Sequence, residues 1–274
     1  RRVLFRSQHT RNLPELVESV LQGKDYELAA IGVSGYPRPL ENSYMPAFLA
    51  GLSVARSLAA LTGAKLEIIS HQENHLEAGV WSADGPWAQR FLLLHASGGT
   101  TDLLLAERQE DGRCRITQVG GSMDLHAGQF VDRVGVALGL QFPAGATLER
   151  LAAGAEARAE LPVSVRKLNV SLSGPCTAAL RALERGTDGA ALALGVEYTL
   201  GETFARLLRN GAAAYDVQDA LLVGGVGSNQ YIRQHVENKL AKRGVRLWVP
   251  EGRFSCDNAA GCAALAWRMN CKHD

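Results

Sequence analysis

The segment Ala220–Arg233 constrains the fold of this chain most, because it combines a strand, a glycine-rich turn and a helix start. The apolar run Leu221–Val223 predicts a short buried strand, and Asn229 is expected to cap a helix that begins at Gln230. Glycines such as Gly225 let the backbone come close to a phosphate, and free N–H groups at a helix start attract anions. Taken alone, the segment is explained equally well as a structural turn of an α/β sheet.

A second segment near the C-terminus repeats this arrangement. Leu247–Val249 predicts the end of another strand, and Cys256–Asn258 is expected to open a helix of small residues that runs through Ala266. An acidic residue at a helix start usually does no more than cap the helix. If the two units are neighbours in one sheet, however, Asp257 lies beside the glycine turn. This pairing is the first indication of an active site.

The spacing of apolar residues along the rest of the chain predicts strands that alternate with helices, the order typical of a parallel or mixed sheet covered by helices. Strands are predicted over 28–33, 66–69, 91–95, 103–107, 116–119 and 168–173. Helices are predicted over 13–22, 45–61, 125–140, 147–157, 177–183 and 190–210, with Gly63 expected to end the second and Gly211 the last. The chain is therefore an α/β protein, built as one large unit or as two lobes.

Composition sets limits on partners and compartment. The chain has 29 lysines and arginines against 28 acidic residues, so its formal net charge is +1 and any contact with RNA has to come from a local patch. Five cysteines without a Cys-x-x-Cys pair favour reduced thiols in a cytoplasmic protein. No stretch approaches a membrane span and no signal peptide is visible, while the start RRVLFRSQHT suggests that residues are missing in front.

Two histidines directly follow the strand predicted over 66–69. His71 and His75 are four residues apart, so on a helix both imidazoles would lie on one face and could share a metal ion with a carboxylate from elsewhere. This geometry fails if the helix begins only at Asn74. A histidine pair at this spacing is more often part of a polar helix face than of a metal site.

A turn and a helical carboxylate are further candidates. Between two predicted strands lies a turn of glycines and hydroxyl residues, namely Ser97, Gly98, Gly99, Thr100 and Thr101. Such a turn can cradle a phosphate through its N–H and hydroxyl groups, although an ordinary hairpin has the same sequence pattern. The many hydroxyls favour the phosphate. Asp132 is the one acidic residue of a mostly apolar helix, so it is either paired with Arg133 at the surface or directed into a cleft.

The order of these motifs resembles that of the universal tRNA threonylcarbamoyladenosine transferase family, long known as O-sialoglycoprotein endopeptidase or glycoprotease. The resemblance runs from about His9 to the C-terminal helix and lacks the strand hairpin with which that family begins. The family's GGVxxN turn is similar to the segment that ends at Asn229, and its CTDNAA segment is similar to Ser255–Ala260. Its FSFSGLKTA segment is echoed by Val170–Ala178. Several motifs in one order are much more specific than any single glycine turn.

The resemblance implies a two-lobed actin-like/sugar-kinase (ASKHA) ATPase fold that is truncated at its N-terminus. Residues 1–94 would form an incomplete first lobe and residues 95–274 a second lobe with the nucleotide-binding turns, while the last helix could pack back on the first lobe. Substrate or nucleotide contacts are implied for the 97–101 turn and for Asp132, Gly145, Gly225 and Asn229. One divalent metal, iron or zinc, would be held by His75 and Asp257, with His71 as a further candidate ligand, and an adenine nucleotide would bind as well.

The departures from the family fall on the chemistry. The family motif HLEAH corresponds to His75–Gly79, so a glycine stands where the family has an imidazole. The SGGHT loop is SGGTT in this chain, and the family's GPGLxGSL loop is replaced by Gly35–Tyr44. His75 and Asp257 alone leave a tetrahedral metal shell incomplete, so water, the nucleotide or His71 would have to complete it.

Three functions are consistent with these observations. The resemblance implies that a threonylcarbamoyl group is transferred from threonylcarbamoyl-adenylate to N6 of an adenosine next to the anticodon of tRNA, by a cytoplasmic enzyme that could have paralogous partner subunits and no membrane contact. The alternative is a paralogue that has lost catalysis and acts as a nucleotide-binding partner or regulatory subunit, as the missing imidazoles suggest. A metallopeptidase is suggested only by the family's older name, because His75–Gly79 lacks the two histidines with an intervening glutamate.

Overall fold

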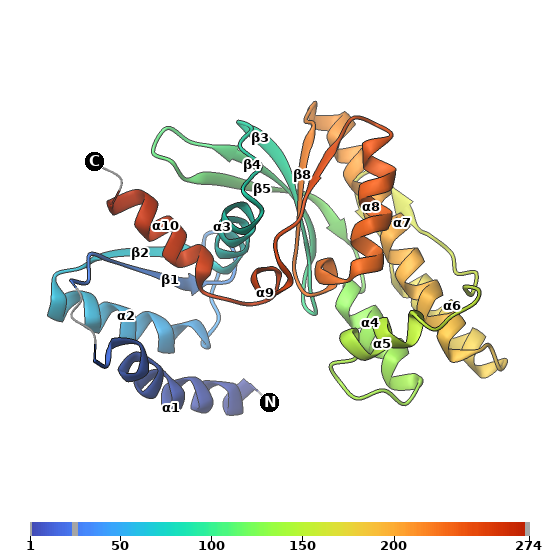
Figure 1. Ribbon diagram of the computed structural model, residues 1–274, viewed down its shortest axis with the longest axis horizontal. Coiled ribbons are helices and arrows are strands. Elements are labelled where there is room, and N and C mark those ends of the chain that lie inside the picture. Colours follow the sequence, from blue (N-terminus) through green and yellow to red (C-terminus); the bar gives the residue numbers. More distant parts are fainter. Residues whose placement is uncertain (1, 24–26, 272–274) are drawn as a thin grey trace.

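The computed structural model describes residues 2–23 and 27–271, which form two β-sheets with helices packed around them (Figure 1). The smaller sheet consists of the parallel strands β1 (Ala30–Tyr36) and β2 (Lys65–Ser70). The larger sheet has the order β6-β7-β5-β4-β3-β8-β9. Its strands are β3 (Arg90–Ala96), β4 (Thr101–Arg108), β5 (Cys114–Ser122), β6 (Val165–Arg166), β7 (Asn169–Val170), β8 (Asp219–Val223) and β9 (Arg246–Trp248).

The helices cover both faces of the sheets. They are α1 (Arg2–Leu21), α2 (Phe48–Thr62), α3 (His71–Ala83), α4 (Ala127–Ala137), α5 (Gly145–Ala152), α6 (Ser173–Glu184), α7 (Gly189–Tyr215), α8 (Gln230–Ala241), α9 (Gly252–Ser255) and α10 (Ala260–Asn270), with a 3₁₀ turn η1 (Val226–Ser228) before α8. Within the described part of the chain, every helix is too short or too polar to cross a bilayer.

The smaller sheet is enclosed by helices on two sides. Figure 1 shows α1 and α2 on one side of β1 and β2, and α10 on the other. The predicted end of α2 is confirmed, because Gly63 caps this helix with a φ of 74° and donates its N–H to the Ala59 carbonyl. The C-terminal helix therefore packs against the first two strands of the chain.

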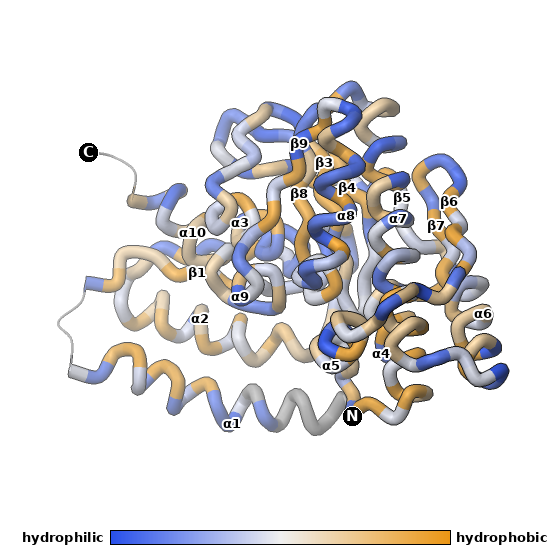
Figure 2. The backbone as a smooth tube through the Cα atoms, turned by 45° about the vertical axis from the view of Figure 1, so that its right-hand side comes forward, coloured by the Kyte–Doolittle hydropathy of each residue, from blue (hydrophilic) through white to orange (hydrophobic). Residues whose placement is uncertain are grey.

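The larger sheet is buried on both faces, which explains the uninterrupted apolar sequence of its central strands. β3 pairs antiparallel with β4 and parallel with β8, so that Leu94 lies between Leu103 and Leu222. One face packs against a cluster that includes Phe130 and Phe204, while the other face packs against α3. Figure 2 shows these hydrophobic strands inside a more hydrophilic periphery. Helix α3 therefore lies on the larger sheet and also contacts β1, β2 and α10.

The long helix α7 does not end where the sequence predicted. It continues through Gly211 to Tyr215 and ends at Asp216, whose φ is 50°. A Cβ at position 211 would lie 2.9 Å from Leu92 Cδ1 and 3.1 Å from Leu103 Cδ2. The glycine therefore permits close packing on the sheet, and the prediction that it stops the helix was wrong.

Other element boundaries also differ from the predictions. Helix α1 begins at Arg2 and not at Leu13, and α5 ends at Ala152 and not at Ala157. The last helix begins at Ala260 and not at Cys256, because the Asn258 side chain accepts the N–H of Ala260 at 2.8 Å and forms a turn in front of it. The strand predicted over 168–173 is limited to β7, since α6 already begins at Ser173. Asp257 is consequently held by an irregular connection between α9 and α10.

The crossing of α3 and α10 leaves no room for a side chain on Gly261. A Cβ there would lie 2.0 Å from the Asn74 carbonyl oxygen and 2.7 Å from the Ala78 nitrogen. We expect Gly261→Ala to lower the free energy of unfolding by about 1–3 kcal/mol, because the added methyl overlaps the backbone of α3. Urea unfolding followed by circular dichroism measures this change.

Gly252→Ala is the matched control, because an added Cβ meets nothing within 4 Å at that position. Its free energy of unfolding should stay within about 0.5 kcal/mol of the wild type. Equal stability of the two variants would contradict the close approach of α3 and α10.

Candidate functional site

Helix α3 starts early enough to place its two histidines on one face. Ser70 caps the helix by accepting the Glu73 N–H at 3.1 Å, and the Glu73 carboxylate accepts the Ser70 N–H at 2.6 Å. This capping box fixes His71 as the first helical residue, so His71 and His75 lie one turn apart. The Ser-x-x-Glu spacing was visible in the sequence and would have settled the helix start.

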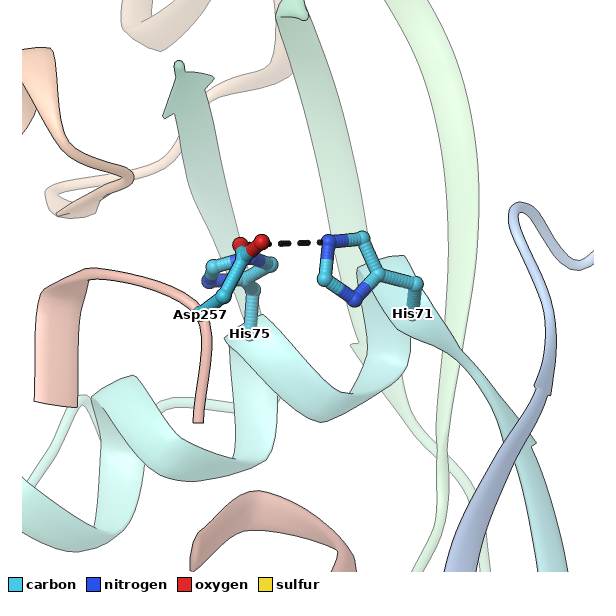
Figure 3. Close-up of side chains that lie close together, drawn as sticks. All are labelled: His71, His75 and Asp257. Carbon is cyan, nitrogen blue, oxygen red and sulfur yellow. Dashed lines mark hydrogen bonds and ion pairs between the residues drawn. The ribbon is translucent and has the colours of Figure 1, made fainter. Parts of the chain in front are cut away.

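Asp257 meets both histidines although it lies far from them in sequence. Its Oδ1 is 3.4 Å from His71 Nε2 and 3.2 Å from His75 Nε2, and one ligand atom from each of the three residues lies within 4.8 Å of the others (Figure 3). His75 is fully buried, whereas Asp257 is exposed. Hydrogen bonds from His71 and His75 hold the pKa of the Asp257 carboxyl far below its usual range, so the carboxylate is ionised. The structure thus brings together all three predicted metal ligands.

Asn74 ties the Asp257 segment to α3. Its Nδ2 donates to the Asn258 carbonyl at 2.7 Å, and its Oδ1 accepts the Cys262 N–H at 2.8 Å. The amide side chain is buried, so both hydrogen bonds are needed to satisfy it. Sequence reasoning had used Asn74 only as an alternative helix start and had missed this role.

His95 belongs to the same cluster and had been missed altogether. It lies on β3 just before the 97–101 turn, and its ring centroid is 4.3 Å from that of His75 and 6.3 Å from that of His71. The residue is 1% exposed, and neither ring nitrogen has a hydrogen-bond partner within the described residues. Burial, together with the neighbouring histidines, holds its pKa well below the usual value, so the imidazole is neutral. A polar residue that ends an apolar strand before a glycine turn was the available signal.

Position 79 does not belong to this cluster. Gly79 faces β8, and an added Cβ would lie 2.8 Å from Val223 Cγ1 and 3.0 Å from Leu221 Cδ2. An imidazole at this position would therefore be directed into the apolar core. The glycine that was expected to remove a metal ligand stands outside the site, and the nitrogen pair of α3 comes from His71 and His75.

A cavity of about 1020 Å³ opens beside the cluster. Its lining combines both sheets and a helix: Gly32 and Ser34 come from β1, His95 comes from β3, and His71 comes from α3. The remaining polar lining includes Arg38, Gln72, Ser97, Gly98, Gly99, Thr100, Gly225, Asp257 and Asn258. Four residues of the predicted 97–101 turn thus border the same cavity as His71, Asp257 and Gly225.

Arg38 contributes a cation to this cavity from the loop that follows β1. Its Nη2 lies 2.8 Å from Asp102 Oδ2, and Gln72 Nε2 donates to the same oxygen at 2.9 Å. Asp102 is buried, and burial raises its pKa although Arg38 opposes the shift. The Arg38 side chain is about one-third exposed, so it can contact an anion in the cavity while it remains paired with Asp102.

The other predicted contact residues have structural partners and do not line this cavity. Thr101 is buried and accepts the Ala127 N–H at 2.8 Å, so its hydroxyl anchors the start of α4. Asp132 accepts the Ala144 N–H at 2.8 Å, just before Gly145 begins α5, and forms no ion pair with Arg133 among the described residues.

Asn229 caps α8 as predicted. Its Oδ1 accepts the Ile232 N–H at 2.9 Å, and its Nδ2 donates to Glu197 Oε1 at 2.6 Å. Both ends of the amide are therefore engaged within the protein. Asn229 therefore joins the end of the glycine turn to α7 and α8, while Gly225 of that turn borders the cavity.

Comparison with known proteins adds sequence evidence to this geometry. The family model of TsaD, described as tRNA N6-adenosine threonylcarbamoyltransferase, matches residues 4–264. A tRNA N6-adenosine threonylcarbamoyltransferase of Methanopyrus kandleri is 31% identical over 261 residues, which is 94% of this chain and 72% of that protein. One of Synechococcus sp. is 34% identical over 278 residues, with 94% and 75% covered.

Solved structures show the fold. HypF of T. kodakarensis has a TM-score of 0.63 at 14% identity and matches 93% of this chain and 42% of that one. A ROK family glucokinase from Streptomyces griseus has a TM-score of 0.51 at 13% identity, with 94% and 86% matched. At such identities the likeness concerns the fold alone. The predicted ASKHA fold is confirmed.

The buried Glu197 carboxyl, which accepts a hydrogen bond from Asn229, makes the free energy of unfolding depend on pH. Burial raises the pKa of Glu197 to about 7 from an ordinary value of 4.5, against the hydrogen bond from Asn229. Because the folded state holds this proton more tightly than the unfolded chain does, ionisation of Glu197 costs stability as the pH rises from about 4.5 to about 7. Glu197→Gln should therefore gain stability relative to the wild type between pH 5 and pH 8, by on the order of 1–3 kcal/mol in urea unfolding.

Asp124→Asn is the control for this experiment. Hydrogen bonds from Ser171, Ser173 and two backbone N–H groups outweigh burial and hold the pKa of the Asp124 carboxyl far below its usual range, so the wild-type carboxylate is ionised at both pH values. This variant should lose a similar amount of stability at pH 5 and at pH 8. A pH-independent difference between Glu197→Gln and the wild type would contradict the raised pKa.

Proposed function

Because this chain belongs to the tRNA N6-adenosine threonylcarbamoyltransferase family, we propose that it transfers a threonylcarbamoyl group from threonylcarbamoyl-adenylate to N6 of an adenosine next to the anticodon of tRNA. In this reaction the adenosine nitrogen forms a bond to the acyl carbon, the bond from that carbon to the phosphate oxygen breaks, and the nitrogen loses a proton. The observation that carries the proposal is the meeting of His71, His75 and Asp257 beside the large cavity.

The donor set fits one divalent metal. Two imidazoles and one carboxylate are the usual ligands of zinc and also suit iron. His71, His75 and Asp257 would hold the ion, which when bound acts as a Lewis acid on an acyl or phosphate oxygen. The ionised Asp257 carboxylate is in the protonation state that a metal ligand needs.

The cavity walls can bind the anionic parts of an adenylate. The turn at 97–100 offers hydroxyls and glycine backbone N–H groups, Gly225 offers an approach without a side chain, and Arg38 offers a charged donor. An adenine nucleotide is therefore the proposed ligand, with Asp132 of α4, Gly145 of α5 and the α8 N-cap Asn229 contributing as the family resemblance implies. The phosphate would lie toward Ser97–Thr100.

The reaction also benefits from exclusion of water, because a mixed anhydride hydrolyses readily. We propose two lobes on either side of the cavity, residues 1–94 and 95–274, with α10 returning to the first lobe. The division at residue 94 falls within β3 of the larger sheet, so the whole of β3 goes with the second lobe. Closing of the lobes would remove water and strengthen the electrostatic interactions inside. Since tRNA is the acceptor, the proposed compartment is the cytoplasm, and partner subunits remain part of the proposal.

The two other functions predicted from the sequence have less support. The regulatory-subunit alternative depended on missing imidazoles, but α3 carries two imidazoles at the site and no comparison favours that alternative. For a metallopeptidase, Glu73 is the only carboxylate between His71 and His75, and it is used to cap α3. It is therefore not free to serve as a general base.

Removal of a ligand should abolish metal binding. We expect His75→Ala and Asp257→Ala to lower the affinity for Zn²⁺ or Fe²⁺ by on the order of a hundredfold or more, because each leaves the ion with an incomplete set of ligands. Metal content after dialysis and titration calorimetry measure the loss. Formation of threonylcarbamoyladenosine on unmodified tRNA should fall in the same variants.

His235→Ala is the matched control for metal binding, since His235 of α8 is paired with Glu202 of α7 and is not a member of the metal cluster. It should retain the metal content of the wild type. If the wild type binds neither metal nor adenine nucleotide, or if His75→Ala rescues a strain lacking the modification, the proposed mechanism is wrong.

A further inference from the structure

A second hollow, separate from the metal cluster, lies between α7 and α8 and has a volume of about 330 Å³. Its charged lining residues are Glu202, Arg206, Arg209, Lys239, Lys242 and Arg243. These five cations and one carboxylate carry a formal net charge of +4, although the whole chain carries only +1. The hollow is therefore the kind of local basic patch that the chain's balanced composition requires for any contact with RNA.

Among the described residues, Glu202 is the only acidic side chain that lines the hollow, and its carboxylate already has three partners. Glu202 accepts Arg206 Nε at 2.8 Å, His235 Nε2 at 3.0 Å and Lys239 Nζ at 3.2 Å. These partners lower its pKa to about 2 against the effect of burial. The carboxylate thus orients Arg206 and Lys239 at the wall of the hollow and has little capacity left to neutralise the other cations.

Three cations of the hollow remain available for a ligand. Within residues 2–23 and 27–271, Arg209, Lys242 and Arg243 form no ion pair, and all three are exposed. Lys242 and Arg243 lie at the end of α8, where cations commonly compensate the helix dipole. Arg209 lies inside α7, so this role does not account for it. The convergence of cations from two helices instead matches a site for phosphate groups.

The hollow lies at the end of α8 that is remote from the cavity, so a ligand that reaches both has to be a large one such as a nucleic acid. Helix α8 begins directly after Asn229, at the turn whose Gly225 borders the cavity, and runs beside α7 (Figure 1). Its 12 residues span about 18 Å at a rise of about 1.5 Å per residue. A tRNA whose adenosine enters the cavity must extend its backbone over the surrounding surface.

We propose that the hollow between α7 and α8 binds backbone phosphates of the tRNA that accepts the threonylcarbamoyl group. This inference rests on the proposed function for the identity of the RNA. Phosphate contacts of this kind position the substrate and read no sequence, so they contribute to affinity in a salt-dependent way. The Arg209, Lys242 and Arg243 side chains make the contacts, while Glu202 holds Arg206 and Lys239 beside them.

The test is an anisotropy titration of fluorescently labelled, unmodified tRNA with the full chain at several KCl concentrations. The variant Arg209→Gln/Lys242→Gln/Arg243→Gln removes only cations without an ion-pair partner, so Glu202 keeps its three partners. We expect its affinity at about 0.1 M salt to fall by on the order of tenfold to a hundredfold, and the slope of log K against log salt to decrease by about one for each lost contact.

Arg56→Gln/Lys65→Gln/Arg185→Gln is the matched control, because it removes the same charge from exposed positions outside the hollow. It should bind tRNA within about twofold of the wild type. Equal affinity and slope in the two triple variants would overturn the proposal, as would a wild type that does not bind tRNA. Titration with tripolyphosphate tests the hollow with a small anion. If the variant Arg209→Gln/Lys242→Gln/Arg243→Gln bound tripolyphosphate more weakly than the wild type but bound tRNA equally well, the hollow would be a small-anion site and the proposal would be wrong.

Two measurements separate this proposal from the proposed function. The triple variant of the hollow should contain as much metal as the wild type, whereas His75→Ala should lose it. A wrong assignment of the metal site would therefore change the result for His75→Ala and leave the result for the triple variant unaffected. Circular dichroism checks the fold, and if the triple variant does not fold, the single variants Arg209→Gln and Arg243→Gln should each lower the salt slope by about one.

Discussion

The two hydrogen bonds of the buried Asn74 amide are the interaction on which the rest of the site depends. They join α3 to the carbonyl of Asn258 and to the N–H of Cys262, on either side of the start of α10. Loss of either bond would leave a buried polar group unsatisfied, at a cost of about 1–3 kcal/mol. Asp257 immediately precedes this anchored segment, so its carboxylate reaches the histidines only while the anchor holds.

Close packing of helices supplies the second part of this constraint. Gly261 lets α10 cross α3 at backbone contact, and the same two helices contact the strands of the smaller sheet. The imidazoles are carried by α3 and the carboxylate by the segment before α10. A displacement of one helix against the other would therefore change the distances between the ligand atoms directly, which couples the packing between the sheets to the chemistry of the site.

Three buried carboxyl groups show how the surroundings decide charge in this protein. Glu202 receives three donors, two of them from arginine and lysine, and its pKa is lowered to about 2. Glu197 receives one neutral amide, and burial raises its pKa to about 7. Asp102 has Arg38 and Gln72 as partners, yet burial still raises its pKa. The nearly balanced formal charge thus conceals one strongly ionised carboxylate in a basic hollow and two others that hold their protons more tightly.

Local features of the site could be predicted from the sequence, because a short stretch of chain determines them. The i, i+4 spacing placed His71 and His75 on one helix face, Asn229 capped α8, and the order of motifs indicated the family and the fold. Helix starts that depend on local capping, such as the one at Ser70, were also encoded locally, although that box was overlooked.

Features built from distant segments were decided only by the tertiary structure. Periodicity does not say that Gly79 faces β8, that His95 ends beside His75, or that Asn74 holds the segment before α10. The basic hollow likewise joins side chains of α7 and α8 that no motif connects. Hydrophobic spacing and capping act over one or two turns of chain, whereas the meeting of α3, β3 and α10 follows from how whole elements pack. The sequence by itself therefore determined the elements and the family, and packing determined which polar groups share a site.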